Sequence, residues 1–431
     1  MPVRALAGRL KLLFEKLIDQ PARSQVRFAH VGFVVFLAGY FAFPNGWWHM
    51  VWFSLAVVLP LFFLRRPSWS VWERRVPFLL ASVVFVLAML AISLRPGTPR
   101  PSWLGWILTL LDIAFLLIFV RMAFRLGKRS SAVSKKAVII MIHVAAVTAV
   151  VSLLVFYWLP GRVFPASRLE NLFVYLGLAP VLTGILYGFA GLAAAILAIR
   201  ESRPRMRGYL LSVEALLLFA ALCSHTRGAV LALAAGFGVL VVTQFNRRVL
   251  PSLAVLVLVA LVYQFALPQI GRLTSPEVPQ ASSNPTAKLV SRKDSGRLGL
   301  YQIILDRMRP PGDYLVGRGR WVNDTVGPPE MTWYAHHPHS IYLATFYRGG
   351  AVGVALLGIV IVMGLASCWR TRQASSSLWL ALACFGLAAL IFDGDDLMTM
   401  ASMPRIEPLL FWFPLAAGVG AAARQNRATN S

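Results

Sequence analysis

Long apolar runs recur along the whole of this chain, and they constrain its fold more than any other feature. Runs of roughly 16 to 25 apolar residues follow one another from residue 30 to residue 422. A run of this length can cross a membrane as a helix, which satisfies every backbone hydrogen bond within the segment. The chain is 58% hydrophobic and only 14% charged, whereas soluble domains are about a quarter charged. The pattern predicts an all-α, polytopic integral membrane protein.

The apolar runs divide into about twelve predicted transmembrane helices. They cover residues 30–46, 49–64, 76–94, 103–120, 137–159, 176–199, 208–224, 228–245, 249–267, 340–366, 374–391 and 407–422. We therefore expect a cytoplasmic amphipathic segment at 1–29, followed by transmembrane helices 1–9 at 30–266. A large periplasmic loop containing helices is expected at 267–339, transmembrane helices 10–12 at 340–422, and a cytoplasmic tail at 423–431.

The positive charge of the chain gathers on one side of the predicted membrane domain. The net charge is +25, and 26 of the 42 lysine and arginine residues fall in seven stretches that we place in the cytoplasm. These are residues 1–29, 65–75, 121–136, 200–207, 247–248, 370–373 and 423–431. Cytoplasmic loops carry such an excess, so both termini are expected in the cytoplasm. Because the charge serves orientation among membrane lipids, no nucleic-acid partner is expected.

The long outer loop, residues 267–339, is where a functional site is most expected. Loops longer than about 15 residues are usually functional or disordered. Its second part repeats apolar residues at helical spacing, namely Leu298, Tyr301, Leu305 and Met308. Arg297 lies one turn before Tyr301, so it is expected on the same inward face of a helix. The guanidinium group would then point toward a central cavity.

His339 ends this hydrophilic loop and precedes the next apolar run. Pro338 is a typical helix-start residue, so we expect His339 in the first turn of that helix. The helix dipole there disfavours the imidazolium ion and keeps the ring neutral, as a base requires. A neutral imidazole in a cavity can take a proton from a hydroxyl group. The alternative is an interfacial histidine that only meets lipid headgroups.

Arginines outside the cytoplasmic stretches are candidates for binding an anion. Arg227 opens a predicted helix, where a cation is unfavourable unless an anion is bound there too. Together with Arg297 it could clamp a diphosphate, because guanidinium groups match phosphate oxygens. The alternative for Arg227 is contact with a lipid phosphate. Arg348 lies in an apolar segment, where a buried cation needs a partner or a function.

Histidines and carboxylates leave a metal site open as a further hypothesis. His336, His337 and His339 lie close together, but their spacing is not that of a standard zinc site. Asp393 and Asp395 belong to an acidic turn, Asp393-Gly394-Asp395-Asp396, whose Asp-x-Asp pair can hold a divalent cation. Such a short match is also typical of a solvated turn. The sequence therefore favours a site without a metal.

Four short motifs, in this order, resemble the O-antigen ligase and O-antigen polymerase superfamily. They are Thr226-Arg227-Gly228-Ala229, Ser295-Gly296-Arg297-Leu298, Leu315-Val316-Gly317-Arg318-Gly319, and the run from His339 through Leu343 to Gly350 and Gly353. The first resembles the family's Ser-Arg-Gly-Ala element, and the last resembles its His-Asn/Ser…Leu…Gly-x-x-Gly signature. A single large loop between the ninth and tenth predicted helices is similar to the layout of the ligases.

The resemblance implies an O-antigen ligase, a GT-C-like membrane glycosyltransferase of the bacterial inner membrane. Such an enzyme would transfer O-antigen polysaccharide from undecaprenyl diphosphate to lipid A-core oligosaccharide at the periplasmic face, in lipopolysaccharide biosynthesis. His339 would act as the general base, and Arg227 and Arg297 would hold the donor diphosphate. The transfer would be inverting and would need no metal or other cofactor. Further candidates for the site are His337, Arg318, Tyr342 and Arg348.

Other activities would use many of the same groups. An O-antigen polymerase would elongate the same lipid-linked glycan, but polymerases of this type usually have two large outer loops. A protein O-oligosaccharyltransferase would transfer the glycan to a serine or threonine hydroxyl. A lipid-linked glycan flippase or transporter would need charges along a path, and Asp112, Glu214 and Arg348 are few for that. Asp112 and Glu214 could instead pair with arginines.

Overall fold

The structure is a computed structural model of the chain. It describes residues 22–62, 76–165, 167–173, 179–244, 247–266, 269, 297–308, 311–322, 338–373, 377–401 and 405–429. Within these ranges all regular secondary structure is helical, and no strand occurs. The prediction of an all-α protein is confirmed for the described part of the chain.

Each predicted transmembrane helix corresponds to one helix or to helices joined end to end. The first part of the chain forms α2 (Ala22–Ala42), α3 (Gly46–Phe53), the π-helical turn η1 (Ser54–Val58), α4 (Leu59–Phe62), α5 (Pro77–Ser93), α6 (Trp103–Lys128), α7 (Ser131–Trp158), α8 (Pro180–Arg200), α9 (Pro204–Cys223), α10 (Arg227–Gln244), α11 (Leu250–Leu261) and η3 (Val262–Ala266). The second part forms α15 (Arg297–Arg307), α16 (Pro311–Val316), α17 (Ile341–Arg370), α18 (Leu378–Ala389), η4 (Pro408–Trp412) and α19 (Phe413–Thr429).

Six of these helices are long and apolar enough to cross a membrane, namely α6, α7, α8, α9, α10 and α17. Five further apolar helices among the described residues are shorter, at 10–17 residues. A short helix can span by continuing into its neighbour or by lying where the bilayer is thinned. The chain is a membrane protein on this evidence, and the count of about twelve spans stays a prediction.

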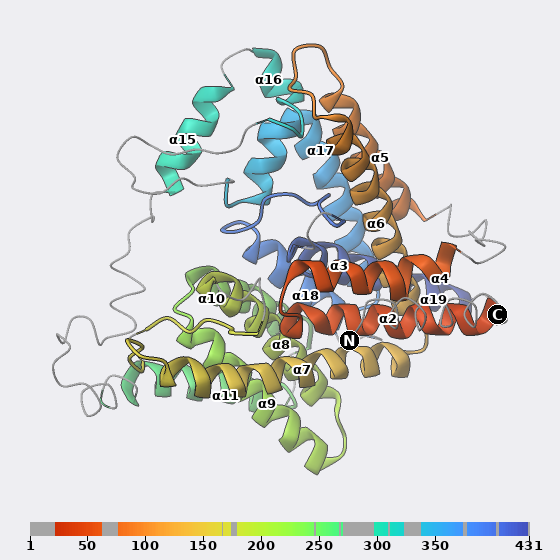
Figure 1. The fold of residues 1–431 in the computed structure, drawn as a ribbon. Coiled ribbons are helices and arrows are strands. Elements are labelled where there is room, and N and C mark those ends of the chain that lie inside the picture. Colours follow the sequence, from red (N-terminus) through yellow and green to blue (C-terminus); the bar gives the residue numbers. More distant parts are fainter. Residues whose placement is uncertain are drawn as a thin grey trace, which may run out of the picture.

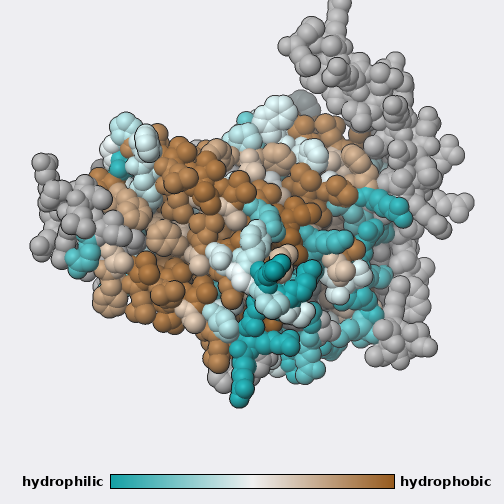
Figure 2. Space-filling model, turned by 90° about the horizontal axis from the view of Figure 1, so that it is seen from below, coloured by the Kyte–Doolittle hydropathy of each residue, from teal (hydrophilic) through white to brown (hydrophobic). Residues whose placement is uncertain are grey.

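Apolar side chains also cover much of the outer surface. Val147, Leu154, Val242 and Val362 are 64%, 67%, 78% and 65% exposed. Figure 2 shows a broad apolar area beside a cluster of hydrophilic side chains. Soluble monomers rarely expose apolar surface on this scale. We infer that the apolar area faces lipid chains.

Helix α8 forms the centre of the bundle. Nearly all of its residues are buried, and it packs against α7, α9, α10 and α18 (Figure 1). Alanine and glycine at positions 190, 191 and 193–195 let these neighbours approach closely. Because α8 is held along its length, residues at its two ends keep a defined position.

Helix α17 is interrupted at Gly350, which has φ 59° and ψ −159°. A residue with a side chain rarely adopts this conformation, whereas glycine does so readily. A turn of the outer loop lies against the break. The backbone N–H groups of Arg318 and Gly319 donate to the carbonyl oxygens of Tyr347 and Arg348, at 2.9 Å in each case. The loop thereby supplies donors to the turn of helix before the break, and it is fixed to the membrane domain.

Gly350→Ala tests this contact. The added Cβ would lie 2.4 Å from the carbonyl carbon of Leu315, on a backbone that disfavours side chains. We expect the unfolding free energy to fall by at least about 1–3 kcal/mol, which would be seen as a lower thermal midpoint in detergent. The matched control is Gly358→Ala in the same helix, where nothing lies within 4 Å of the added Cβ. Equal midpoints for the two variants would contradict the close contact.

Candidate functional site

The turn between α9 and α10 places Arg227 at the first residue of α10. The Thr226 hydroxyl donates to the carbonyl oxygen of Pro180 at 3.0 Å, and it accepts from the Ser224 hydroxyl at 2.9 Å. Gly184 of α8 leaves room for this packing, because a Cβ there would lie 2.2 Å from the Ser224 Oγ. The turn is therefore locked against the start of α8, and the position of Arg227 follows from it.

Three arginines from distant parts of the chain line one cavity beside this turn. The cavity has a volume of about 170 Å³, and Arg168, Arg227 and Arg297 all contribute to its wall. The other lining residues are Val181, Ile185, His225, Thr226, Gly228 and Phe392. No acidic side chain lies among these lining residues, and the first turn of α10 adds the positive end of a helix dipole. The arrangement suits a bound anion, above all a phosphate group.

Arg168 was not anticipated from the sequence. Its Nε donates to the carbonyl oxygen of Ser224 at 3.0 Å, and the N–H of Leu169 donates to the carbonyl oxygen of Cys223 at 2.9 Å. The segment around Arg168 is therefore attached to the same turn that carries Arg227. The available signal was a basic residue in a connection that the sequence predicts to lie outside, where the positive-inside rule expects few.

Helix α15 brings Arg297 to the cavity, but its buried face differs from the predicted one. Leu300, Ile304 and Met308 are 2%, 0% and 0% exposed, whereas Leu305 is 39% exposed. Of the predicted face, Met308 is buried and Tyr301 is partly buried, so the prediction is wrong at Leu305. Leu300 and Ile304 take its place, because this side of the helix meets Val322 and Tyr347. The sequence of α15 has two apolar faces that are about equally hydrophobic, and contacts with the rest of the protein decide which one is buried.

The expected placement of His339 in the first turn of the helix is also wrong. Ser340 is the N-cap and α17 begins at Ile341. His339 has φ 53°, a left-handed conformation that a right-handed helix cannot include. Its Nδ1 faces the carboxylate of Asp393, 3.5 Å from Oδ1, and the two side chains are 29% and 11% exposed. The imidazole thus stands just outside the helix, partly open to solvent and beside an acid.

Asp393 connects His339 with the arginine-lined cavity. Its Oδ1 accepts from the N–H of Gly394 at 2.8 Å, which fixes the carboxylate, and the preceding residue, Phe392, lines the cavity. Tyr301 belongs to α15, the helix that begins at Arg297. Burial raises the pKa of the Tyr301 hydroxyl, the charge of Arg297 opposes that rise, and the charge of Asp393 adds to it. The adjacent residues Phe392 and Asp393 therefore link the wall of the arginine cavity to His339.

Arg318 joins the two helices of the outer loop to α17. Its Nη1 donates to the carbonyl oxygen of Arg307 at 3.2 Å and to the Tyr347 hydroxyl at 3.4 Å. Its Nε lies 3.6 Å from a carboxylate oxygen of Asp313. Because Arg307 ends α15 and Asp313 lies in α16, this one side chain holds both helices in place. Arg318 does not line the cavity.

A buried ion-pair network holds the outer loop against α6. The Nη2 of Arg320 lies 2.8 Å from a carboxylate oxygen of Asp112 and 3.2 Å from one of Asp396. The other oxygen of Asp112 accepts from the N–H groups of Met400 and Ala401, at 2.8 and 2.7 Å. Burial alone would raise the pKa of Asp396, but Arg320 and nearby Arg348 hold it at about 2. Asp112 is thus paired with an arginine, one of the two possibilities that the sequence left open.

Arg348 takes part in a second ion-pair group. It binds the side chain of Asp395, and its Nη1 donates to the carbonyl oxygen of the same residue at 2.8 Å. The Asp395 carboxylate also binds Arg405, and the Asp395 N–H donates to Glu407 at 2.8 Å. The acidic turn is therefore engaged by arginines at Asp395 and Asp396. Arg348 holds this turn and does not line the arginine cavity.

The remaining candidates lie elsewhere or beyond the described residues. The Tyr342 hydroxyl donates to the carbonyl oxygen of Leu387 at 3.0 Å, so its side chain ties α17 to α18. Glu214 is fully buried within α9. His336 and His337 lie outside the described residues. Within the described part of the chain, no group of three metal-binding side chains comes together.

Comparison with known protein families singles out the same part of the chain. Residues 211–358 match the model of the family described as O-antigen ligase. The matched region begins within α9 and ends within α17, and it includes Arg227, Arg297 and His339. No curated protein matches the chain. The resemblance of the sequence motifs is thereby confirmed.

Arg320→Met tests the ion pairs that fix the loop. The change takes away the guanidinium group that the buried Asp112 shares with Asp396, so we expect a loss of about 3–5 kcal/mol in unfolding free energy. The control is Arg162→Met, which removes an exposed partner 3.7 Å from Glu170, and it should cost less than about 1 kcal/mol. Thermal unfolding of the purified variants in detergent measures both. A small effect at Arg320 would mean that the network does not hold the loop.

Proposed function

Because the chain belongs, through residues 211–358, to the O-antigen ligase family, we propose that it transfers O-antigen polysaccharide from undecaprenyl diphosphate to lipid A-core oligosaccharide. The observation that carries this proposal is the convergence of Arg168, Arg227 and Arg297 on one cavity. Phe392 in its wall leads directly to Asp393 and the imidazole of His339. A phosphate-binding cavity beside a potential base is what glycan transfer from a lipid diphosphate requires.

The arginines would hold the diphosphate of the donor. Guanidinium groups bind phosphate oxygens through paired hydrogen bonds and keep their charge at every physiological pH. During transfer the bond between the sugar and the diphosphate breaks, and negative charge grows on the leaving oxygen. Cations placed beforehand around that oxygen lower the barrier. Three arginines and the start of α10 can supply this charge, so we propose a transfer that uses no metal ion.

His339 would act as the general base on the acceptor sugar. Its Nδ1 faces Asp393, so Nε2 is the ring atom left to meet the acceptor hydroxyl. The long Nδ1–Oδ1 distance of 3.5 Å is typical of a site without substrate. Nε2 takes the hydroxyl proton while the oxygen attacks the anomeric carbon from the side opposite the diphosphate. The new glycosidic bond forms with inversion, undecaprenyl diphosphate leaves, and Asp393 stabilises the imidazolium ion.

The placement of the charges supports an inner-membrane enzyme with its site on the periplasmic face. Helix α8 has Val181 at the arginine cavity and ends in Arg200, and α17 runs from beside His339 to Arg370. The helices thus have the candidate site at one end and basic residues at the other. By the positive-inside rule the basic ends face the cytoplasm. Helices α15 and α16 would then belong to a large periplasmic loop of a GT-C-like protein.

The identity of the acceptor distinguishes the proposed ligase activity from the most similar alternative activities. An O-antigen polymerase or a protein O-oligosaccharyltransferase would use the same donor, the same arginines and the same base. A flippase or transporter is less well supported, because Asp112 and Arg348 are held in ion pairs instead of lining a path. Only the product of the reaction distinguishes the three transferases.

The first experiment is transfer by the purified protein in detergent. We expect polysaccharide from undecaprenyl-diphosphate-linked O-antigen to appear on lipid A-core, and His339→Ala to abolish that product while keeping its thermal midpoint. Mass spectrometry or gel analysis of the products measures both. Longer glycan on the carrier would identify a polymerase, and glycan only on protein would identify an oligosaccharyltransferase. Undiminished transfer by His339→Ala would move the base to another residue, with His337 the next candidate.

Arg297→Ala and Arg227→Ala test the diphosphate site. Each change removes a cation that stabilises the leaving group, so we expect kcat to fall by about 100-fold or more. The matched control is Arg307→Ala, at the far end of the same helix as Arg297 and away from the cavity. It should leave kcat within a few-fold of the wild type. Near-normal turnover by Arg297→Ala would remove that residue from the site.

A further inference from the structure

A second cavity lies at the end of α8 that is remote from the arginine cavity. It has a volume of about 360 Å³ and is formed where α6, α7, α8, α18 and α19 meet. Ile185 of α8 lines the arginine cavity, whereas Ile196 and Arg200 of the same helix line this one. The fifteen helical steps from Ile185 to Arg200 span about 22 Å. The two cavities therefore lie toward opposite ends of α8.

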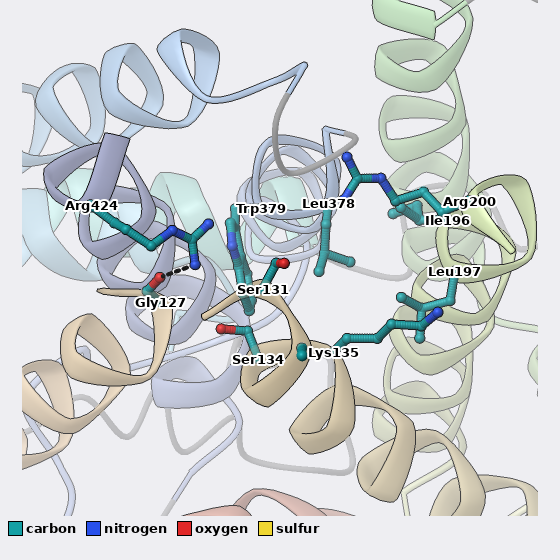
Figure 3. Close-up of a pocket in the computed structure, with 11 residues that line it drawn as sticks. Gly127, Ser131, Ser134, Lys135, Ile196, Leu197, Arg200, Leu378, Trp379 and Arg424 are labelled. Carbon is teal, nitrogen blue, oxygen red and sulfur yellow. Dashed lines mark hydrogen bonds between the residues drawn. The ribbon is translucent and has the colours of Figure 1, made fainter. Parts of the chain in front are cut away.

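Three cationic side chains frame this cavity. Lys135 comes from α7, Arg200 from α8 and Arg424 from α19, and Figure 3 shows them around a common space. Arg424 is held in place because its Nη1 donates to the carbonyl oxygens of Gly127 and Arg129. These carbonyls end α6, so the guanidinium group is anchored before any ligand binds.

Lys135 is the member of this group that lies beside an acidic side chain in the described part of the chain. The Lys135 Nζ lies 2.9 Å from a carboxylate oxygen of Glu201, which it shares with Arg203. These partners hold the pKa of Glu201 at about 2, so the carboxylate remains ionised at neutral pH. Glu201 itself does not line the cavity, and no acidic side chain is among the residues that do. The wall thus has an excess of positive charge that favours an anion.

The rest of the wall combines polar and apolar side chains. Ser131 and Ser134 belong to the first turn of α7, whose dipole favours negative charge. Leu197, Leu378 and Trp379 supply apolar surface, and Figure 3 places Trp379 between Arg424 and Leu378. Tryptophan is enriched where polar headgroups meet acyl chains. A ligand that matches both the cationic and the apolar side chains has an anionic headgroup and an apolar body.

We propose that this cavity binds the headgroup of an anionic phospholipid. Its phosphate would lie among Lys135, Arg200 and Arg424, and its glycerol and upper acyl chains would lie against Leu197 and Trp379. Basic pockets between membrane helices are suited to such headgroups, which stay in the plane of the bilayer surface. The lipid would join the ends of α7, α8 and α19 at the surface opposite His339. The proposal is independent of the transfer reaction, since it concerns a different cavity and is measured by binding.

Native mass spectrometry of the purified full-length protein tests the proposal. The protein is titrated in detergent with phosphatidylglycerol, with phosphatidylcholine of the same chain length, or with inorganic phosphate. We expect one phosphatidylglycerol to be retained in preference to phosphatidylcholine and to raise the thermal midpoint. Inorganic phosphate alone should not reproduce that rise. Equal retention of the two lipids, or an equal midpoint rise with phosphate, would overturn the proposal.

Single variants identify the place of binding. Arg200→Gln and Arg424→Gln should each weaken retention of phosphatidylglycerol about fivefold, because each removes one cation from the phosphate. The matched control is Arg205→Gln, an exposed arginine at the same end of the bundle that does not line the cavity. Ala132→Trp fills the cavity without a change of charge and should also reduce retention. Equal retention by Arg205→Gln and the cavity variants would show that general surface charge attracts the lipid.

Discussion

The contact between the outer loop and the break in α17 holds the rest of the candidate site in place. The N–H groups of Arg318 and Gly319 bond to carbonyl oxygens next to a helix interruption, where glycine at 350 permits close approach. An unsatisfied carbonyl in an apolar environment costs several kcal/mol, so both partners gain from the contact. From this point Arg318 fixes α15 and α16. The position of Arg297 at the cavity depends on that attachment.

Arginines serve two different purposes in this protein. Arg320, Arg348 and Arg405 are paired with buried or partly buried carboxylates, and they connect the outer loop and the acidic turn to the membrane helices. Arg168 and Arg227, together with Arg297, surround an open cavity instead. The first set gives rigidity and the second gives a place for an anion. The acidic turn contributes to both, because Asp393 lies beside His339 while Asp395 and Asp396 bind arginines.

Sequence reasoning was most successful where the physics is local. An apolar run forms a helix in a membrane wherever the chain turns next, so every predicted segment contains a helix. Arg227 at a helix start and Arg297 in a loop helix could be singled out for the same reason. Predictions from the sequence were wrong where two local arrangements, such as two faces of one helix, are about equally favourable. On α15, Leu300 and Ile304 are buried in place of Leu305, because the helix packs against Tyr347. The helix α17 starts after His339, because His339 is in a left-handed conformation.

The sequence by itself determined an all-helical membrane protein, its charge asymmetry and its relation to the O-antigen ligase family. Only the tertiary structure decided which charges meet. Arg320 and Asp112 are 208 positions apart, His339 and Asp393 are 54 apart, and Arg168 joins Arg227 through the turn at Ser224. No periodicity or motif encodes such pairs, since many arginines could neutralise a given carboxylate equally well. The packing of α8, α15 and α17 decides which arginine lies close to a given carboxylate. It thereby decides which arginines form ion pairs and which line the cavity.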